Sequence, residues 1–371
     1  GNGTITPYGV AYDNGIKLIN RYGEKMDDAT TEFVEAYLDG NIKKLGIDGD
    51  DIPFAHRDGI GSIVDYVAGR NRYVGYLISV ASHSYKDLRI GLDCANGASW
   101  MIAKAVFDAL GAKTYVIGAS PDGLNVNKDC GSTHIENLIE FVRENRLDAG
   151  FAFDGDADRC IAVDENGRIV DGDCILYILG TRLKSRGILD GDTVVATVMS
   201  NSGLFKAFES AGIKYELTAV GDRFVYECMQ KNGYRLGGEQ SGHIILQKYA
   251  TTGDGLLTAI MLTEEMRDRK LPLSKLAEPV RLYPQTVKSI RVASKEQALS
   301  DPEVKAEFDA INKEINGNGR ALLRASGTEP VVRIMLECES EELCEKYTAR
   351  LLEAIHKLSL IHISEPTKRT P

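Results

Sequence analysis

Three aspartates at alternate positions are the residues of this chain that most directly imply chemistry. Asp154, Asp156 and Asp158 lie in the segment Phe151–Val163, between two short apolar runs that we interpret as buried strands. Three carboxylates a few ångströms apart repel one another by roughly 1 to 4 kcal/mol per pair. A hard divalent cation with oxygen ligands would offset this repulsion. The spacing therefore predicts a magnesium site that serves phosphate chemistry.

Two other interpretations of the same segment are weaker. The spacing also fits the start of a calcium EF-hand loop, with Glu165 at its last ligand position. However, Arg159 stands where that loop needs glycine, and strand-like residues flank the motif where helices should be. A solvated acidic turn is the other alternative, and the apolar runs on both sides disfavour it.

A glycine-rich turn, Gly237–His243, holds a carboxylate, a hydroxyl and an imidazole. Glycines let the backbone approach a ligand closely. Glu239 and Ser241 could hydrogen-bond to neighbouring sugar hydroxyls, and His243 could act as an acid or base near neutral pH. The alternative is a tight turn into a strand, but a turn alone does not need these three side chains together.

A third motif, Arg324–Arg333, joins two predicted strands. Ser326, Gly327 and Thr328 offer hydroxyls and backbone N–H groups that could surround an anion. Arg324 and Arg333 flank them, and guanidinium forks match phosphate oxygens. We therefore predict a phosphate-binding loop, with a plain hairpin as the alternative.

Three further segments carry weaker signals. Lys17 could carry a proton or contact phosphate, although an ordinary surface lysine explains it too. Gly221–Arg223 precedes a predicted helix, where it could orient an anion at the helix N-terminus or supply an aspartate N-cap. Ser82 lies beside a histidine in a predicted linker and lacks the glycine-bounded elbow of a nucleophilic serine.

Composition limits the classes of protein that this chain can belong to. Its 371 residues suggest two to four domains, and 43% hydrophobic with 26% charged residues is typical of a soluble globular protein. The net charge of −10 argues against nucleic-acid and membrane partners. Seven scattered cysteines fit a reducing compartment, and no apolar run is long enough to span a membrane. We therefore expect a cytoplasmic location.

Strand-like and helix-like runs alternate through the middle of the chain, which predicts consecutive three-layer α/β domains with mixed sheets. The predicted strands are Arg89–Asp93, Lys113–Ile117, Ala149–Phe153, Thr193–Val198 and Lys214–Thr218, and the predicted helices are Ala98–Leu110, Ile135–Asn145, Gly203–Ala211 and Phe224–Lys231. The first part of the chain shows two helical stretches, Thr30–Leu45 and Gly61–Leu77.

The last part of the chain has a different pattern, which predicts an α+β domain. Its expected strands are Thr286–Val292, Arg320–Arg324 and Val331–Glu337, and its expected helices are Asp301–Ile315 and Glu341–Lys357.

Together the motifs resemble those of the α-D-phosphohexomutase superfamily, and within it the glucosamine branch. Asp154–Arg159 resembles the family's magnesium loop, Gly238–His243 its sugar-specificity loop, and Arg324–Arg333 its phosphate-binding loop. Pro121–Asn127 and Cys130–His134 also resemble the glucosamine branch. The motifs follow one another in the family's order.

The resemblance implies an isomerase that interconverts glucosamine 6-phosphate and glucosamine 1-phosphate on the route to UDP-N-acetylglucosamine. The reaction would pass through a phosphoserine enzyme and a bisphosphate intermediate. Magnesium is the implied cofactor, held by the three aspartates, and a sugar phosphate is the implied partner, with a homodimer as the assembly to test. The implied catalytic groups are Lys17, Arg159 and His243, and the implied substrate contacts are Glu239, Ser241, Arg324, Ser326, Gly327, Thr328 and Arg333.

The pattern along the chain places candidate domain boundaries near 82–86, 185–191 and 282–285, and the resemblance implies what each domain contributes. We expect a remnant of the first, nucleophile-bearing domain over 1–82 and a second domain with the metal loop over 86–186. A third domain with the sugar loop follows over 187–281, and a C-terminal phosphate-binding domain over 285–357. The stretch 358–371 is a tail without family character.

One departure from the family concerns its nucleophile loop, Ser-Ala-Ser-His-Asn-Pro. Thr4–Ala11 stands in its place, with Pro7 where the phosphorylated serine should be. Thr4, Thr6 and Ser82 carry hydroxyls, but nothing supports any of them as a substitute. We therefore expect the chain as given to lack mutase activity.

Alternative functions remain open from the sequence. They are a non-catalytic sugar-phosphate-binding fragment, a phosphomannomutase or phosphoglucomutase of the same superfamily, and a phosphatase with a D-x-D aspartyl nucleophile. The phosphatase is the weakest of these, because Asp158 and Arg159 fit metal and phosphate binding better than that motif.

Overall fold

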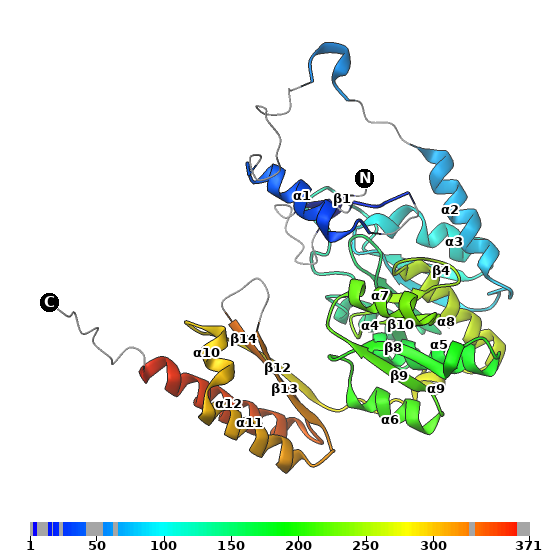
Figure 1. Ribbon diagram of the computed structural model, residues 1–371. Helices are drawn as coiled ribbons and strands as arrows, with labels where there is room; N and C mark the ends of the chain where they lie inside the picture. Colours follow the sequence, from blue (N-terminus) through cyan, green and yellow to red (C-terminus); the bar gives the residue numbers. More distant parts are fainter. Residues whose placement is uncertain are drawn as a thin grey trace. The chain divides into compact units, whose positions relative to one another are not determined.

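The computed structural model describes residues 3–5, 14–16, 18–21, 25–41, 55–61, 66–325 and 331–361 (Figure 1). The chain forms two compact units. The first consists of residues 1–199 with 211–279, and the second of residues 200–210 with 280–371.

A five-stranded mixed sheet carries the candidate metal loop in the first unit. Its strand order is β4-β3-β5-β6-β7. Strands β3 (Arg89–Asp93), β4 (Lys113–Ile117) and β5 (Ala149–Phe153) are parallel, whereas β6 (Cys160–Asp164) and β7 (Ile169–Val170) run antiparallel to their neighbours. All residues of β5 are buried, as expected for a central strand covered on both faces.

The order of connections in this sheet shows where a ligand would bind. Strand β3 leads to β4 on one side, while β5 pairs with the other side of β3. The carboxyl ends of β3 and β5 therefore form a topological switch point, the place where open α/β sheets bind ligands. Asp154, the first residue after β5, lies at this point.

A second sheet in the same unit has the order β11-β10-β8-β9. Strands β8 (Thr193–Thr197), β9 (Lys214–Thr218) and β10 (Leu236–Gly238) are parallel, and β11 (Ile244–Leu246) returns antiparallel to β10. The turn between β10 and β11 is the predicted sugar loop.

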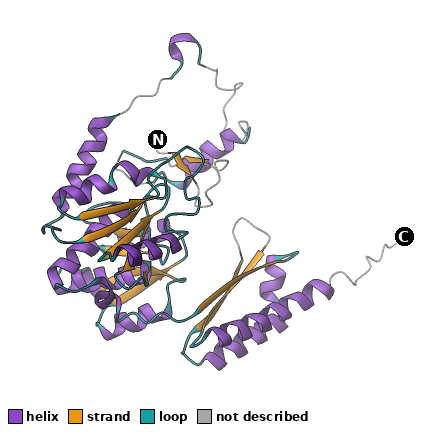
Figure 2. Ribbon diagram, turned by 180° about the vertical axis from the view of Figure 1, so that it is seen from behind, coloured by secondary structure: helices purple, strands orange, loops and turns teal. Residues whose placement is uncertain are grey.

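Helices lie beside both sheets of the first unit (Figure 2). They are α2 (Val67–Val80), α3 (Ala103–Ala109), α4 (Glu136–Asn145), α5 (Gly172–Ser185), α7 (Asp222–Asn232), α8 (Gly255–Arg269) and α9 (Leu273–Ala277), with 3₁₀ turns at Arg57–Gly59, Ala98–Met101 and Asp190–Asp192. Nearer the N-terminus are β1 (Gly3–Ile5), its antiparallel partner β2 (Asn14–Ile16) and helix α1 (Asp28–Leu38). No helix in the described part of the chain is both long and apolar enough to cross a membrane.

The second unit is an α+β fold, built on a three-stranded antiparallel sheet of order β12-β14-β13. Its elements are α6 (Ser202–Ser210), β12 (Gln285–Arg291), α10 (Lys295–Ser300), α11 (Pro302–Ile315), β13 (Arg320–Ala325), β14 (Val331–Glu337) and α12 (Glu341–Ile361). One face of the sheet buries Ile290, Val332 and Ile334 in a core with residues of α11 and α12. Asp301 caps α11 by accepting hydrogen bonds from two backbone N–H groups of its first turn, and Pro302 fits that turn because it has no N–H to satisfy.

Helix α6 is anchored to the sheet of the second unit. Ser202 donates to the buried Glu337 from its backbone N–H (3.1 Å) and from its hydroxyl (2.5 Å). Arg320 Nε donates to the same carboxylate at 3.0 Å. Glu337 therefore joins α6 to two strands, although the sequence suggested that this helix belongs with the preceding α/β domain. The domain limits given above stay a prediction.

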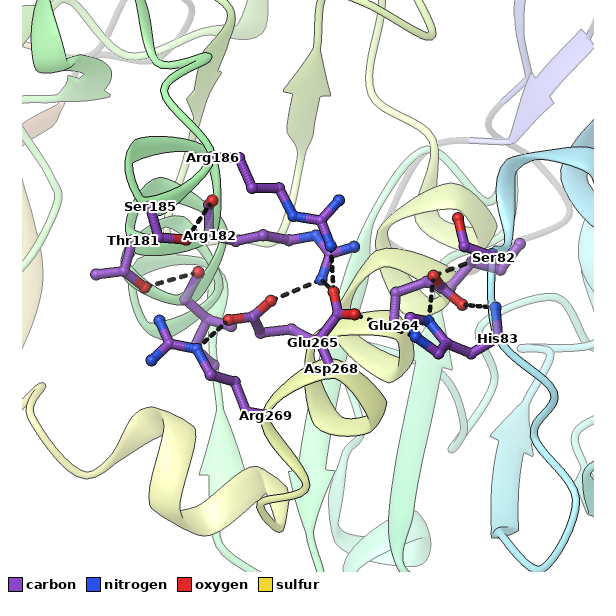
Figure 3. A network of polar contacts seen from close by, with 12 residues as sticks. Ser82, His83, Thr181, Arg182, Ser185, Arg186, Glu264, Glu265, Asp268 and Arg269 are labelled. Atoms are coloured by element: carbon purple, nitrogen blue, oxygen red, sulfur yellow. Dashed lines mark hydrogen bonds and ion pairs between the residues drawn. The ribbon is translucent and has the colours of Figure 1, made fainter.

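A network of buried charges joins α5, α8 and the segment after α2 in the first unit (Figure 3). Arg182 is 3% exposed and donates to Glu265 Oε2 at 2.6 Å, and it also contacts Asp268. Glu264 is 1% exposed and accepts the backbone N–H groups of Ser82 (3.0 Å) and His83 (3.2 Å). Helix α8 thereby fixes the start of the segment that leads to β3.

Several predicted elements differ from those observed. The helix expected over Ala98–Leu110 is a 3₁₀ turn followed by the shorter α3. The helix expected over Thr30–Leu45 ends at Leu38, and the one expected over Gly61–Leu77 covers Val67–Val80. The last helix continues to Ile361, four residues into the predicted tail 358–371, and the rest of that tail lies outside the described residues.

Candidate active site

The three aspartates of the predicted metal loop come together in space. One carboxylate oxygen from each of Asp154, Asp156 and Asp158 lies within 4.8 Å of the other two. The loop is tight because Ala157 adopts a left-handed conformation (φ 60°) and donates its N–H to the carbonyl of Asp154 at 3.0 Å. Asp154 is buried, whereas the other two are partly exposed.

The electrostatics of this loop favour a bound cation. Burial, followed by the charges of Asp158 and Asp156, raises the pKa of Asp154 to about 8. Arg159 opposes this by donating its backbone N–H to Asp154 Oδ1 at 3.1 Å. Its guanidinium Nε lies 3.9 Å from Asp154 and 4.0 Å from Asp158. The three clustered carboxylates form an all-oxygen donor set that fits a hard divalent cation such as magnesium.

The metal loop and the sugar loop are held together by backbone hydrogen bonds. Cys160, which directly follows the metal loop, donates its N–H to the carbonyl of Gly242 at 3.0 Å. Gly172, the first residue of α5, donates to the carbonyl of Gln240 at 2.9 Å and so ties the sugar loop to that helix. Gly242 has a φ of 90°, and a Cβ at this residue would lie 2.3 Å from the Cys160 carbonyl oxygen. Only glycine permits this approach, so the residue type follows from the contact between the two loops.

The predicted sugar-contacting residues have different surroundings. Glu239 Oε1 accepts the backbone N–H of Gly221 at 2.9 Å, which ties the sugar loop to the start of α7. Ser241 is exposed, and His243 is almost fully buried. The structure therefore brings His243, Arg159 and the three aspartates into one cluster, with Arg159 and His243 paired as a β-bridge.

Asp222 is a site residue that the sequence pattern left ambiguous. It is the first residue of α7 and not its N-cap, which is Gly221 and makes no side-chain capping bond. Asp222 forms an ion pair with Lys25, and its Oδ2 lies 3.5 Å from His243 Nε2. Burial raises the pKa of Asp222, but the hydrogen bond and the charge of Lys25 oppose burial, and the pKa is lowered overall. The N-cap interpretation was wrong because the carboxylate faces the cluster instead.

A cleft of about 1070 Å³ opens beside the metal loop. Its lining includes Asp156, Asp158, Asp222, Arg223 and Asp254. The cleft is large enough for a small polar ligand such as a hexose phosphate. Among the described residues that line it, Glu239 and Ser241 are not found, so their predicted contacts with a sugar stay untested.

Two arginines of the predicted phosphate loop face each other in the second unit. Arg324 on β13 is the direct cross-strand neighbour of Arg333 on β14. Burial, followed by the charge of Arg333, lowers the pKa of Arg324. Like charges placed opposite each other are unfavourable, and a bound anion would relieve this repulsion. Ser326, Gly327 and Thr328, like Lys17, lie outside the described residues.

A third arginine, which the sequence reasoning missed, lies on the same sheet face. Arg291 on β12 pairs with Val331, two residues before Arg333, so the alternation along β14 places Arg291 and Arg333 on one face. Only the register of β12 against β14 shows this, because Arg291 belongs to no local motif.

Comparisons with known proteins identify the family. Models of phosphoglucomutase/phosphomannomutase match domain II over residues 71–167, domain III over 171–283 and the C-terminal domain over 288–354. A phosphoglucosamine mutase of Lachnospira eligens is 58% identical over 344 residues, which are 93% of this chain and 75% of that protein. The chain belongs to the phosphoglucosamine mutase family. The family's enzyme from Bacillus subtilis is 46% identical, over 92% of this chain and 75% of its own length.

Solved structures confirm the fold expected for a phosphoglucosamine mutase family member. A phosphoglucomutase/phosphomannomutase family protein from Burkholderia thailandensis aligns with a TM-score of 0.65 at 22% identity, over 78% of this chain and 64% of that one. An N-acetylphosphoglucosamine mutase from Aspergillus fumigatus, in complex with GlcNAc-6P and magnesium, aligns with a TM-score of 0.64 at 19% identity, over 78% and 65%. The chain thus spans slightly less than two thirds of these two neighbours.

Removing an arginine from the phosphate loop should weaken sugar-phosphate binding selectively. We expect Arg333→Ala to reduce the affinity for glucosamine 6-phosphate about tenfold or more, because a charge-assisted hydrogen bond contributes roughly 1.5 to 3 kcal/mol. Affinity for unphosphorylated glucosamine should not change. Titration calorimetry with both ligands measures the difference, and Lys305→Ala on α11 is the matched control. If Arg333→Ala binds glucosamine 6-phosphate as tightly as the parent chain, the segment is only a hairpin.

Proposed function

We propose that this chain provides the metal-binding and substrate-binding parts of a phosphoglucosamine mutase, an isomerase acting on glucosamine 6-phosphate and glucosamine 1-phosphate. The observation that carries the proposal is the cluster of Asp154, Asp156 and Asp158 at a switch point of the sheet, beside a cleft of about 1070 Å³. Because the chain is 58% identical to a phosphoglucosamine mutase, we expect magnesium to bind to these three aspartates.

Each group of the cluster has a chemical part in this proposal. The three aspartates would hold magnesium, which neutralises charge developing on a transferring phosphoryl group. Arg159, with its guanidinium near Asp154 and Asp158, would contact the same group. Lys17 and His243 would move protons, and Glu239 with Ser241 would bind sugar hydroxyls.

The non-reacting phosphate would bind to Arg324, Arg333 and the loop of Ser326, Gly327 and Thr328. The facing arginines support this assignment, because two guanidinium groups on one sheet face offer donors that match phosphate oxygens. A sugar phosphate is therefore the partner that we propose. The preference for glucosamine over mannose or glucose rests on the relatives, whose names state that substrate. A cytoplasmic location stays a prediction.

The experiment combines binding with turnover. Titration calorimetry should show that magnesium strengthens glucosamine 6-phosphate binding to the 371-residue chain and that Asp156→Asn removes this effect. If neither magnesium nor Asp156→Asn changes the affinity for glucosamine 6-phosphate, the result contradicts the proposed site.

A parallel assay tests the predicted lack of activity. The chain is incubated with glucosamine 6-phosphate, magnesium and a trace of the 1,6-bisphosphate, and formation of the 1-phosphate is measured. We expect none, because Pro7 has no hydroxyl to carry a phosphoryl group. Turnover, or a stable phosphate on Thr4, Thr6 or Ser82, would overturn that expectation. Sustained release of phosphate from the bisphosphate would instead favour a phosphatase.

A further inference from the structure

The imidazole of His243 is buried between the sugar loop and the metal loop, and both of its nitrogens face a partner. The residue is 2% exposed. Its Nε2 accepts the backbone N–H of Gly253 at 3.0 Å, while its Nδ1 lies 3.5 Å from Asp158 Oδ1. Any role of this side chain must be consistent with these two contacts.

The contact with Gly253 fixes the position of the ring proton. A backbone N–H can only donate, so Nε2 must offer its lone pair to Gly253. A neutral imidazole that accepts at one nitrogen carries its proton on the other. The proton of His243 therefore resides on Nδ1, and this N–H is directed at the side of the ring where Asp158 lies.

The backbone around Gly253 leaves the ring no room to shift. A Cβ at Gly253 would lie 2.6 Å from the carbonyl oxygen of Asp158 and 2.7 Å from His243 Nδ1. The next residue, Asp254, caps α8 by accepting the N–H of Leu257 at 2.9 Å, and it also accepts the hydroxyl of Tyr73 at 2.8 Å. The backbone N–H of Gly253, which orients His243, is thus held in place through Asp254, both by the N-cap of α8 and by Tyr73 of α2.

The other charged neighbours of the ring are already paired. Asp222 lies 3.5 Å from Nε2 but forms an ion pair with Lys25. Arg159 stays 4.0 Å from the carboxylate of Asp158. Nδ1 of His243, at 3.5 Å, is therefore closer to the carboxylate of Asp158 than the guanidinium of Arg159 is.

We infer that His243 is a positioning residue, whose Nδ1–H holds the carboxylate of Asp158 in the orientation that a divalent cation requires. This inference rests on the proposed function, because Asp158 needs positioning only if it is a metal ligand. Groups that hydrogen-bond to metal ligands typically contribute 10-fold to 100-fold to metal affinity. The role differs from that of a proton carrier, which the sequence predicted for His243 and which stays a prediction.

Three substitutions separate the two ring nitrogens. Asparagine places an N–H near the position of Nδ1, glutamine places its amide near Nε2, and leucine has the shape of asparagine without polar atoms. We expect His243→Asn to bind magnesium nearly as well as the parent chain. His243→Leu and His243→Gln should bind it about tenfold more weakly. Titration calorimetry with magnesium chloride alone measures this, independently of activity.

The pair His243→Asn and His243→Leu controls for folding. Both variants lose the hydrogen bond from Gly253, so both should lose similar thermal stability, while only the leucine variant should lose metal affinity. Equal magnesium affinities in these two variants would overturn the inference. The metal assignment itself fails on a different result, namely unchanged magnesium binding in Asp156→Asn.

The parent chain offers a check that needs no variant. With ¹⁵N-labelled histidine, the ring nitrogens of His243 can be assigned among the six histidines of the chain. The inference expects a protonated Nδ1 and an unprotonated Nε2, and an Nε2–H tautomer would overturn it even if every variant failed to fold.

Discussion

Replacing Arg182 with methionine is expected to lower the free energy of unfolding by about 3 to 5 kcal/mol. Arg182 is 3% exposed and donates to Glu265, which is equally buried (Figure 3). Methionine fills much of the same volume but leaves the carboxylate of Glu265 with only Arg269, a half-exposed partner whose Nε donates to Oε1 at 2.9 Å. A buried charge that has lost its buried partner is poorly compensated, so the loss should exceed that of an ordinary surface pair.

Two matched variants make this prediction specific. Arg186→Met removes a half-exposed arginine that pairs with Asp268 in the same network, and it should cost at most about 1 kcal/mol. Adding Glu265→Leu to Arg182→Met removes the poorly compensated carboxylate and should recover a large part of the loss. Urea unfolding of the three variants gives the free energies. A loss below about 1 kcal/mol for Arg182→Met alone would contradict the prediction and show that Arg269 or water compensates the charge of Glu265.

The elements that the sequence predicted well are those with a local pattern. Strands Ala149–Phe153 and Lys214–Thr218 have the predicted limits because short apolar or alternating runs end at turn residues. The metal loop was predictable for the same reason, since all three carboxylates lie within five consecutive residues. In each case the residues involved are close together in the sequence, so their arrangement could be predicted without knowledge of the whole fold.

Helix α8 shows why other elements were missed. Every residue from Gly255 to Met266 is buried, so the helix has no polar face and gives no 3.6-residue alternation. Helix α5 is buried over most of its length for the same reason. The sequence predicted neither helix, although α8 packs against β5, β6 and α5 and supplies Glu264, the carboxylate that fixes Ser82 and His83.

The contacts that organise the candidate site join residues far apart in the chain. Lys25 pairs with Asp222, 197 residues away, and Tyr73 donates to Asp254, 181 residues away. No spacing rule connects such residues, because their proximity follows only from packing of the whole unit. The sequence therefore indicated which residues could do chemistry but not how Asp222, Gly253 and Tyr73 support them.

Magnesium affinity is expected to rise with pH, by about tenfold per unit, up to the pKa of Asp154 near 8. Burial and the charges of Asp158 and Asp156 raise this pKa, so the metal-free loop keeps a proton on Asp154 below that pH. A cation can bind only after the proton leaves, and each bound ion should therefore release about one proton. Above pH 8 the carboxylate is already ionised, so the affinity should level off.

The same pKa predicts the stability of the metal-free chain. A carboxylate whose folded-state pKa is raised binds more protons when folded, so it contributes stability at low pH that is lost as the pH rises from about 4 to about 8. Magnesium should reverse this trend, because it replaces the proton and binds only the folded loop. Thermal unfolding with and without magnesium, measured across this range, tests both signs.

Asp154→Asn is the control for this prediction. It removes the titrating group, so magnesium should bind more weakly but with little change between pH 6 and 8, and without proton release. Calorimetry in two buffers of different ionisation enthalpy counts the protons directly. Two results would contradict the prediction: the parent chain releases no proton near pH 7, or the magnesium affinity of Asp154→Asn still rises tenfold per pH unit. Either would show that a group other than Asp154 controls magnesium binding.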